Sequence, residues 1–322
     1  MGKKLLVLDW DTPVVSAAAM CQNTYVAKHK ESGIETPVKS QKAFKAKIDK
    51  KYWDDYEFIY KPTPITPPTD KTDVKDFKPE YVGMHSVKVE LEKVLAQSAS
   101  WRKDYWIVVH KEGNHRNEIA TIAEYKGNRK PKPIFTQTIK EYVVDKYKDK
   151  VIYVEGEETD DRVVQFMHQE FLRVGEDKPN FDVVLGGIDK DLRQVVGWHW
   201  NFRTFEFEWI DSFKAAKNFF IQTIMGDGTD NIKGLVDLPT EVKKQYGATA
   251  RKGVGIKTAE LLLADCKKPQ EMFQRVVDLY KIQYPDNWFP VLEENCQLLY
   301  LKKTPDDSYN LQERLERFKI NV

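Results

Sequence analysis

Short apolar runs alternating with longer segments of helical spacing are the feature that most constrains how this chain of 322 residues can fold. The first run, Leu5 to Leu8, is apolar throughout and ends directly in Asp9. A continuous apolar run of this length predicts a strand buried on both faces. Similar runs occupy residues 105–110, 151–154 and 181–185. We therefore predict an α/β fold with a mostly parallel central sheet flanked by helices.

Apolar residues at helical spacing predict the elements between these strands. The expected helices cover residues 14–27, 86–97, 119–125, 136–147 and 159–174. Residues 198–202 and 205–209 have the pattern of a hairpin, and the chain from 211 to about 300 is mostly helical in pattern. We therefore expect an α/β domain over residues 1–210 and a helical region over residues 211–322.

Residues 28–100 break this pattern. Lysines are dense between Lys28 and Lys51, and the prolines between Lys61 and Pro68 exclude a helix or a central strand there. We interpret residues 28–100 as a lysine- and proline-rich insertion that contains an extended linker.

Composition limits the classes of protein that fit. The net charge is only +1, so any affinity for nucleic acid must come from local patches. The first apolar run is too short for a signal peptide, and no later run reaches membrane length, so we expect a soluble, cytoplasmic protein. The cysteines Cys21, Cys266 and Cys296 are isolated in the sequence, which is typical of free thiols in a reducing compartment.

Three groups of carboxylates fall where strands are predicted to end and helices to begin, the edge at which parallel sheets bind ligands, and a fourth group shares the glycine-rich segment described below. A single short acidic motif is weak evidence, because such motifs usually cap helices or lie in solvated turns. Packed together, however, these carboxylates would repel one another unless hard cations such as Mg²⁺ or Mn²⁺ lay between them. Two ions about 3.5–4 Å apart could activate a water and stabilise the leaving oxygen of an in-line displacement. The acids are Asp9, Glu158, Asp160, Asp161, Asp189, Asp191, Asp227 and Asp230.

A glycine-rich segment follows the last of these acids. Residues 253–259 (GVGIKTA) form a predicted turn that enters an apolar helix, and such a turn directs backbone N–H groups at a phosphate. Lys257 stands at the predicted helix start, where a cation opposes the helix dipole, so a bound phosphate explains it better than helix stability does. Metal-binding acids beside a phosphate cradle indicate metal-assisted phosphate chemistry on a polyanion.

These motifs resemble those of the 5′-nuclease family, which includes flap endonucleases and phage 5′→3′ exonucleases. The length and the late helical region are most similar to the phage-encoded exonucleases, and the implied fold is PIN-like. The matching pieces, in family order, are LVLD at 6–9, YKGNR at 125–129, EGEETDD at 155–161, GIDKDLRQV at 187–195, IMGDGTDNIKG at 224–234 and GVGIKTAELLL at 253–263.

The resemblance implies an enzyme that hydrolyses DNA from the 5′ side, and the RNA of RNA–DNA hybrids, in replication or degradation. It implies one metal near Asp9, Glu158 and Asp160. It implies a second metal near Asp189, Asp191, Asp227 and Asp230, with Asp161 as support.

The resemblance also assigns residues that contact DNA. Lys126 and Arg129 would contact the scissile phosphate, and Tyr125 would stack on a terminal base. A helix–three-turn–helix element at about 226–264 would grip duplex DNA, with K⁺ held by backbone carbonyls. Its DNA contacts would be Gly253, Val254, Gly255, Ile256, Lys257 and Thr258.

Two features depart from the family pattern. The family places an aspartate after the second strand, where this chain has His110 followed two residues later by Glu112. His110 is then a ligand, or Glu112 substitutes for the aspartate, or the first metal is held more weakly. The stretch between Arg129 and Glu155 is short for a helical arch, which leaves threading of a 5′ strand open and offers the lysines at 28–51 as an alternative substrate wall. The expected partners are DNA with a 5′ end, nick or flap, and replication proteins, for a monomer in the host cytoplasm if the chain is phage-encoded.

Two other classes of protein fit part of the sequence. Residues 9–12 (DWDT) resemble the nucleophile motif of haloacid-dehalogenase-type phosphatases, in which Asp9 would be the nucleophile and Asp11 the general acid. That interpretation also uses Gly226 to Asp230 as a metal motif, but it gives no role to Glu158, Asp189 or the glycine-rich segment. A structure-specific DNA-binding protein with weak or no catalysis is the second alternative, and its motivation is His110.

Overall fold

The computed structural model describes residues 4–62, 78–249 and 253–322, and the chain packs as two compact units. The first unit comprises residues 1–9, 101–129 and 153–322, and the second comprises residues 10–100 and 130–152. The first unit contains both most of the central sheet and the C-terminal helices, and the predicted domain boundary after residue 210 stays a prediction.

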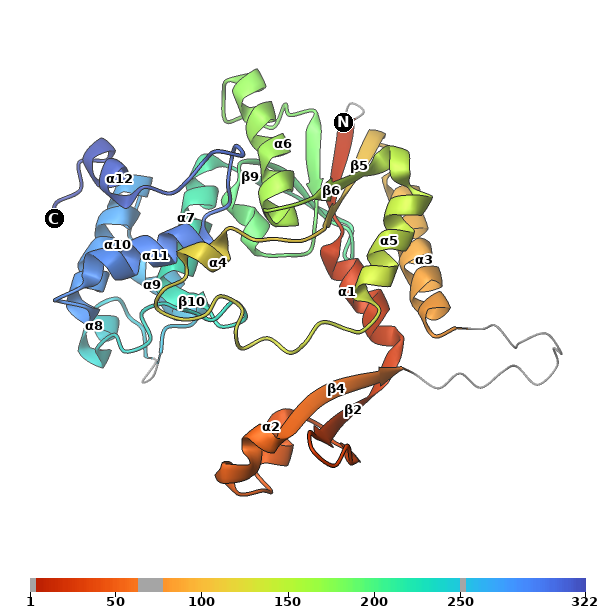
Figure 1. Cartoon of the computed structure of the whole chain (residues 1–322). Coiled ribbons are helices and arrows are strands. Elements are labelled where there is room, and N and C mark those ends of the chain that lie inside the picture. The colour runs from red at the N-terminus through yellow and green to blue at the C-terminus, as the bar shows by residue number, and fades with distance from the viewer. Residues whose placement is uncertain (1–3, 63–77, 250–252) are drawn as a thin grey trace. The chain divides into compact units, whose positions relative to one another are not determined.

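The central sheet is mostly parallel, which confirms the predicted α/β class (Figure 1). Its strands are β1 (Lys4–Asp9), β5 (Arg102–His110), β6 (Val151–Val154), β7 (Val183–Gly186), β8 (Gly197–Asn201) and β9 (Glu206–Ile210). Their order is β6-β5-β1-β7-β8-β9. Strand β1 pairs in parallel with β5 and β7, and β7 pairs in parallel with β8. The antiparallel β8–β9 hairpin at one edge was also predicted.

The apolar runs explain why β1 lies in the middle of this sheet. Leu6, Val7 and Leu8 are fully buried, as expected for a strand covered on both faces. Asp9 is in register with Val108 of β5, and the preceding residue is in register with Gly186 at the end of β7. Because the three strands are parallel, their carboxyl ends lie at one edge of the sheet.

One predicted helix, α6 (Thr159–Val174), packs against β1, β5 and β7 within the first unit. Its buried residues Val163, Val164 and Met167 form the apolar face that contacts the sheet. The helix ends at Gly175, whose φ of 74° is the left-handed conformation that glycine adopts at helix ends. The opposite end of the helix, its first turn, lies at the edge of the sheet where the parallel strands end.

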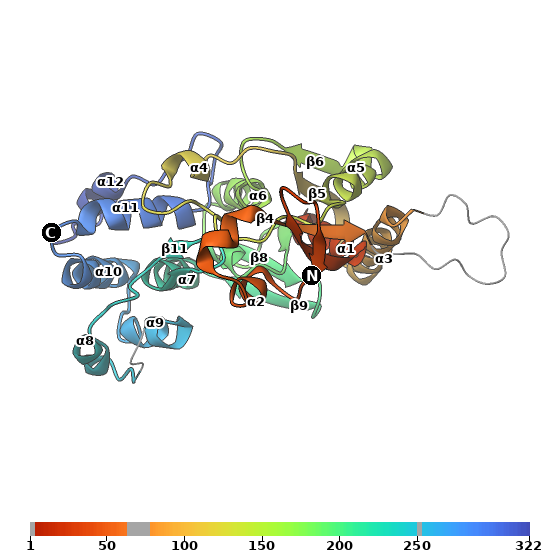
Figure 2. The same ribbon diagram turned by 60° about the horizontal axis from the view of Figure 1, so that its bottom comes forward.

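The C-terminal part of the first unit is helical, as predicted (Figure 2). Helix α7 packs against α9, α10 and α11, and these helices share one hydrophobic core that includes Ile224, Leu262 and Phe273. The elements are α7 (Ser212–Met225), the short strands β10 (Gly226–Asp227) and β11 (Ile232–Lys233), α8 (Thr240–Gln245), α9 (Ile256–Leu262), α10 (Pro269–Gln283), α11 (Trp288–Leu299) and α12 (Leu311–Arg317).

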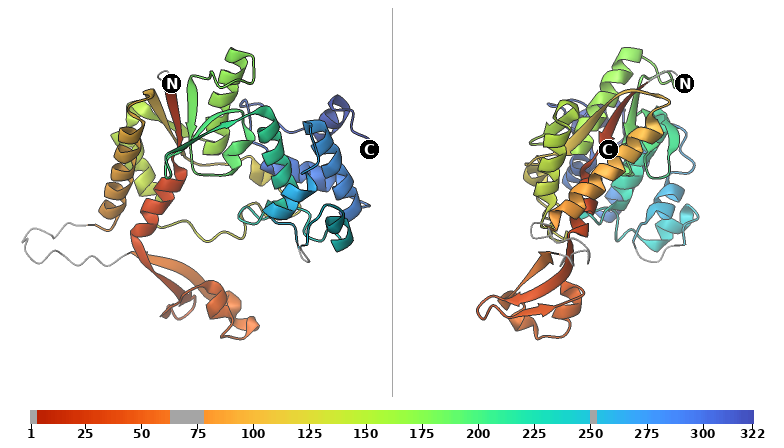
Figure 3. Two further views of the ribbon diagram at one scale, coloured as in Figure 1. Left: turned by 180° about the vertical axis from the view of Figure 1, so that it is seen from behind. Right: turned by 90° about the vertical axis from the view of Figure 1, so that its right-hand side faces the viewer.

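Three helices pack together in the second unit: α1 (Asp11–Met20), α3 (Glu80–Ser98) and α5 (Thr136–Lys146) (Figure 3). Helices α3 and α5 were predicted from their apolar spacing. Gly83 of α3 lets them approach closely, because a Cβ atom there would lie 2.7 Å from Cys21 Sγ and 2.8 Å from Ile139 Cδ1. The three cysteines of the chain are buried free thiols.

The predicted helix over residues 14–27 is wrong beyond Met20. Residues Gln22–His29 form strand β2, which pairs in antiparallel fashion with β3 (Glu35–Pro37) and β4 (Tyr56–Pro62). Thr24, Tyr25 and Val26 are β-branched or aromatic, and their pairing with β4 outweighs the local helical spacing. Helix α2 (Gln41–Lys45) and the 3-10 helix η1 (Lys50–Asp55) lie between β3 and β4. The rest of the predicted proline-rich linker, residues 63–68, lies outside the described residues.

The predicted helix over residues 119–125 is also wrong. Helix α4 covers only Arg116–Ile119, and the chain then turns. The carboxylate of Glu294 accepts the backbone N–H groups of Thr121 and Ile122 at 3.0 and 2.9 Å, so these groups are bound by a side chain instead of by helical carbonyls.

None of the helices in the described parts of the chain has the length and apolarity needed to cross a bilayer.

Candidate active site

The predicted acids come from four segments of the first unit. Asp9 ends β1 and is 4% exposed. Glu158 precedes α6, and Asp160 and Asp161 lie in its first turn. Asp189 follows β7, and Asp191 begins the 3-10 helix η4 (Asp191–Gln194). Asp227 ends β10, and Asp230 lies in the turn between β10 and β11.

The acids predicted for the first metal lie close to Asp160. Burial, together with the carboxylates of Asp9, Asp189 and Glu158, raises the pKa of Asp160 well above its usual range. Neighbouring negative charges disfavour ionisation of a carboxyl group, and a bound cation would relieve their repulsion. The structure therefore brings together the carboxylates of the predicted first site, and Asp189 of the predicted second site adjoins them.

The acids predicted for the second metal surround Asp191. Burial and the carboxylate of Asp189 raise the pKa of Asp191 to about 7, and Asp227 and Asp230 add to the rise while Lys190 opposes it. Lys190 Nζ lies 3.6 Å from Asp227 Oδ2. The Gln222 side chain on α7 donates a hydrogen bond to Asp191 Oδ1, which fixes the orientation of this carboxylate.

A tight turn after α7 positions the last two acids. Gly226 has a φ of 72°, and a Cβ atom there would lie 2.3 Å from the Gly234 nitrogen, so the turn requires glycine. Asp227 Oδ1 accepts the N–H groups of Thr229 at 2.7 Å and of Asp230 at 3.2 Å. These hydrogen bonds close a tight turn that carries two of the predicted acids three residues apart.

Basic side chains of the YKGNR segment lie among the acids. Lys126 Nζ forms an ion pair with Glu158 and lies 3.7 Å from Asp230 Oδ2. Arg129 forms an ion pair with Asp230. Within the described residues, no three His, Cys, Asp or Glu side chains are arranged as a ready metal site. In this arrangement Lys126 and Arg129 neutralise part of the acidic charge.

The YKGNR segment is fastened along the turn that carries the acids. The Lys126 N–H donates to the Asp230 carbonyl at 2.9 Å, and Asn128 Nδ2 donates to the Gly228 carbonyl at 2.6 Å. In the opposite direction, Asn231 Nδ2 donates to the Glu124 carbonyl at 2.9 Å. Lys126 and Asn231 adopt left-handed φ values of 59° and 63°, which these hydrogen bonds maintain. We call residues 124–129 and 228–231 together the clasp.

Tyr125 is a buried residue of the clasp. Its side chain is 7% exposed and packs in the helical core. Its hydroxyl donates to Asp230 Oδ2 at 2.7 Å and lies 3.1 Å from Glu158 Oε2. Burial and the Glu158 carboxylate raise the pKa of Tyr125, which keeps the phenol protonated. Stacking on a terminal base, as the family resemblance implies, would require the ring to leave this position.

Asp161 is held by a buried arginine that the sequence analysis missed. Arg116, at the start of α4, donates to the two oxygens of Asp161 at 2.7 and 2.9 Å. Both side chains are at most 1% exposed, and Arg116 also donates to the carbonyls of Leu298 and Tyr300. Although burial opposes it, the Arg116 guanidinium holds the pKa of Asp161 below its usual range. Asp161 also accepts the Glu158 N–H at 3.3 Å, which suits its predicted supporting role.

His110 and Glu112 have other partners in this structure. His110 Nε2 lies 2.8 Å from the Gly113 carbonyl oxygen. The Glu112 side chain is 71% exposed, 3.9 Å from Lys111 Nζ. A metal-binding role for either residue stays a prediction.

The glycine-rich segment joins two short helices, α8 and α9. Val254 and Thr258 are buried, whereas Lys257 is exposed and Ile256 is 52% exposed. Lys243 of α8 is 1% exposed and donates to the Gly253 carbonyl at 3.3 Å, so this lysine holds the segment in place. DNA binding by residues 253–258 stays a prediction, as does a K⁺ ion.

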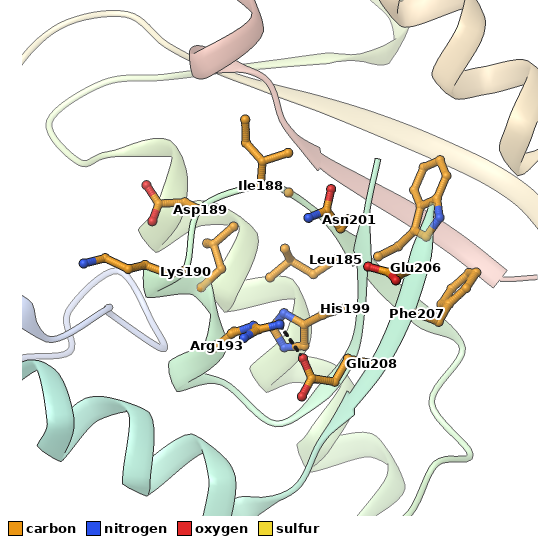
Figure 4. A pocket seen from close by; sticks show the side chains of 13 residues that line it. Leu185, Ile188, Asp189, Lys190, Arg193, His199, Asn201, Glu206, Phe207 and Glu208 are labelled. Atoms are coloured by element: carbon orange, nitrogen blue, oxygen red, sulfur yellow. Dashed lines mark ion pairs between the residues drawn. The ribbon is translucent and has the colours of Figure 1, made fainter. Parts of the chain in front are cut away.

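A pocket of about 630 Å³ is lined by Asp189, one of the predicted acids, and by the neighbouring Lys190 (Figure 4). It extends along the β8–β9 hairpin, where an ion pair of 2.6 Å joins Arg193 to Glu208. Burial lowers the pKa of His199, a further lining residue, to about 4, so this histidine is neutral. The pocket offers space beside the carboxylates for part of a substrate.

Arg116, Gln222 and Lys243 hold functional segments and were missed by the sequence analysis. No motif marks Arg116 or Gln222, because each contacts an acid 31 or more positions away. Lys243 has a local signal, since a lysine that falls on the apolar side of a short helix is a candidate for a buried contact.

No family model and no curated protein sequence matches the chain. Its structure is similar to that of the bacteriophage T5 D15 protein co-crystallised with metal ions, with 17% identity, a TM-score of 0.38, and coverage of 67% of this chain and 91% of that one. It is also similar to the T5 D15 flap endonuclease in a complex with DNA and metal ions, with 15% identity, a TM-score of 0.36, and coverage of 67% and 90%.

Because the identities and TM-scores are low, the function proposed below rests on residues of this chain.

We expect the buried ion pair between Arg116 and Asp161 to control the stability of the first unit. Arg116→Met leaves the buried Asp161 carboxylate without its charged partner, with only the N–H groups of Glu158 and Lys302 donating to it, so the free energy of unfolding should fall by about 3–5 kcal/mol. Arg193→Met, which breaks an exposed pair with Glu208, should cost less than about 1 kcal/mol. Urea unfolding of both variants measures the difference.

The double variant Arg116→Met, Asp161→Leu should recover part of the loss, because it removes both charges. Equal unfolding midpoints for Arg116→Met and the wild type would contradict the importance of this pair.

Proposed function

We propose that this chain is a metal-dependent 5′ nuclease that hydrolyses phosphodiester bonds of DNA. The observation that carries the proposal is that carboxylates from four separate segments come near one another, Asp9, Glu158 and Asp189 beside Asp160, and Asp189, Asp227 and Asp230 beside Asp191. Burial and the mutual repulsion of these carboxylates raise the pKa values of Asp160 and Asp191. Such a concentration of carboxylates, with shifted pKa values, favours a catalytic role over a structural one.

The donor atoms fit a hard divalent cation. They are carboxylate oxygens, the ligands that Mg²⁺ and Mn²⁺ prefer, and two groups of them adjoin at Asp189. In the proposal, Asp9, Glu158 and Asp160 hold one ion. The other ion is held by Asp189, Asp191, Asp227 and Asp230. When bound, the metal supplies Lewis-acid activation of a water and stabilisation of the leaving oxygen.

The clasp residues have a second task in this proposal. Lys126 and Arg129 neutralise Glu158 and Asp230 in the structure described here. Once divalent cations neutralise these carboxylates, the two basic side chains can turn to the scissile phosphate, where charge-assisted hydrogen bonds are strong. Asp161 holds the backbone of Glu158, and Gln222 orients Asp191, so both act as positioning residues.

The finer points of the proposal come from the family resemblance. They are cleavage from the 5′ side, action on nicks, flaps and RNA–DNA hybrids, a role in replication, and duplex binding by residues 253–258 with K⁺. The pocket beside Asp189 would receive a nucleotide next to the cleaved bond.

The decisive experiment is incubation of 5′-labelled and 3′-labelled duplex, nicked and flap substrates with Mg²⁺. A 5′ nuclease releases short labelled products from the 5′-labelled strand and shortens the 3′-labelled strand progressively or at the flap. Release of inorganic phosphate alone would indicate a phosphatase, and binding without cleavage would indicate a DNA-binding protein.

Removal of two carboxylates should separate catalysis from binding. We expect Asp189→Asn, Asp191→Asn to lower Mg²⁺-dependent cleavage at least about 10³-fold, since metal-ion stabilisation is worth several kcal/mol. DNA affinity measured with Ca²⁺ should stay within about threefold of the wild type, because the substitutions remove negative charge and leave the basic residues.

Asp286→Asn, Asp306→Asn is the matched control, since it makes the same charge change at two exposed positions. If the double variant at 189 and 191 retained more than about a tenth of wild-type activity, the metal assignment would be wrong.

Lys257 provides a test of duplex binding by the glycine-rich segment. If the exposed ammonium group contacts a phosphate, Lys257→Ala should weaken duplex binding and reduce the slope of log K against log salt by about 0.9. Lys148→Ala, an exposed lysine outside this segment, should leave the slope unchanged. Fluorescence anisotropy at several salt concentrations measures both, and an unaltered slope for Lys257→Ala would remove this lysine from the interface.

A further inference from the structure

A second cavity, of about 430 Å³, lies in the first unit between α6, α7, α10 and α12. None of the predicted metal ligands lines it. The nuclease proposal gives this cavity no task, although its volume is in the range of small-molecule sites.

The cavity wall is mainly aromatic. The rings of Phe219 and Tyr309 are 5.4 Å apart, and Tyr300 lies 5.5 Å from Tyr309, measured between ring centres. Phe220 stacks on Phe273 at 5.6 Å on the same lining. Flat faces of this kind accept another flat ring by stacking.

Three basic side chains line the same cavity: Lys303, Arg314 and Arg317. The Arg314 guanidinium lies 4.3 Å from the centre of the Tyr309 ring and 5.1 Å from that of Tyr300. Across the described chain, no carboxylate lies within the 4.0 Å ion-pair distance of any of the three. Asp307 instead accepts the Tyr300 hydroxyl at 2.8 Å and the Lys303 N–H at 3.0 Å.

The unpaired positive charge has an energetic cost. Lys303 and Arg314 are half-buried, and burial together with Arg314 and Arg317 lowers the pKa of Lys303, while Asp307 opposes the shift. Burial and the positive charge of Lys303 also lower the pKa of His168, a fourth lining residue. Cations that lack water on one side and repel one another are stabilised when an anion joins them.

We propose that this cavity binds a nucleotide, with the base against the aromatic wall and the phosphate at Lys303, Arg314 and Arg317. Three positively charged side chains carry more charge than one carboxylate would balance, and they suit a phosphate dianion. The aromatic wall suits a flat base better than a flexible aliphatic chain. The ligand is either a free mononucleotide or the terminal nucleotide of a strand, since each presents a flat base and a phosphate.

The test is calorimetric titration with deoxyadenosine 5′-monophosphate in the presence of a chelator, so that no cleavage occurs. One site per chain is expected. Deoxyadenosine lacks the phosphate and inorganic phosphate lacks the base, so each should bind about tenfold more weakly or worse. Because the readout needs no cleavage, failure here leaves the nuclease proposal intact, and failure of the nuclease proposal leaves this site intact.

Two variants locate the site. Arg314→Gln removes a phosphate contact and Ala216→Phe fills the cavity without changing charge, so each should weaken binding by about tenfold or more. Lys319→Gln is the matched control, because it removes an exposed charge that does not line the cavity. Lys303→Gln replaces Arg314→Gln if the latter unfolds on loss of its contacts with Tyr300 and Tyr309.

Competition identifies the source of the ligand. A 5′-phosphorylated tetranucleotide that displaces the mononucleotide, when its 5′-hydroxyl form does not, supports the end of a strand. Displacement by neither tetranucleotide supports a free mononucleotide. Absence of mononucleotide binding, equal binding by both cavity variants and the wild type, or tighter binding of dodecyl phosphate than of the nucleotide would overturn the proposal.

Discussion

Repulsion between carboxylates at one edge of the central sheet is the constraint on which the rest of the site depends. Parallel strands place Asp9 and the residues after β7 at the same edge, and α6 adds Glu158 and Asp160. The chain manages this charge in three ways. Arg116 neutralises Asp161, the clasp neutralises Glu158 and Asp230, and protonation is favoured at Asp160 and Asp191. The remaining deficit of positive charge is what a divalent cation would supply.

Much of the fold could be predicted from the sequence because its core strands are continuous apolar runs. Three of the four acidic groups could be expected at one edge for the same reason, since each follows such a run or begins a helix, whereas Asp227 and Asp230 follow helix α7. The prediction failed where a distant partner overrides local spacing. Glu294 binds the N–H groups of residues 121 and 122, and β4 pairs with residues that have helical spacing at 22–27.

The residues that hold the acids in place could not be identified from the sequence, for a related reason. Arg116 contacts Asp161 from 45 positions away, and Lys126 contacts Glu158 from 32 positions away. No periodicity or local motif connects residues at such separations. The family resemblance supplied Lys126 as a phosphate contact, whereas the structure shows the same ammonium group paired with Glu158.

The clasp has a consequence for how the protein would behave without metal. Many metal-dependent domains lose their fold when a chelator removes the ion, because the ligands are then left facing one another. Here the carboxylates of Glu158 and Asp230 already have basic partners on a segment that is hydrogen-bonded along the acidic turn. Chelation would then act as a reversible off switch for activity, leaving behind a folded protein that can be stored, handled and reactivated.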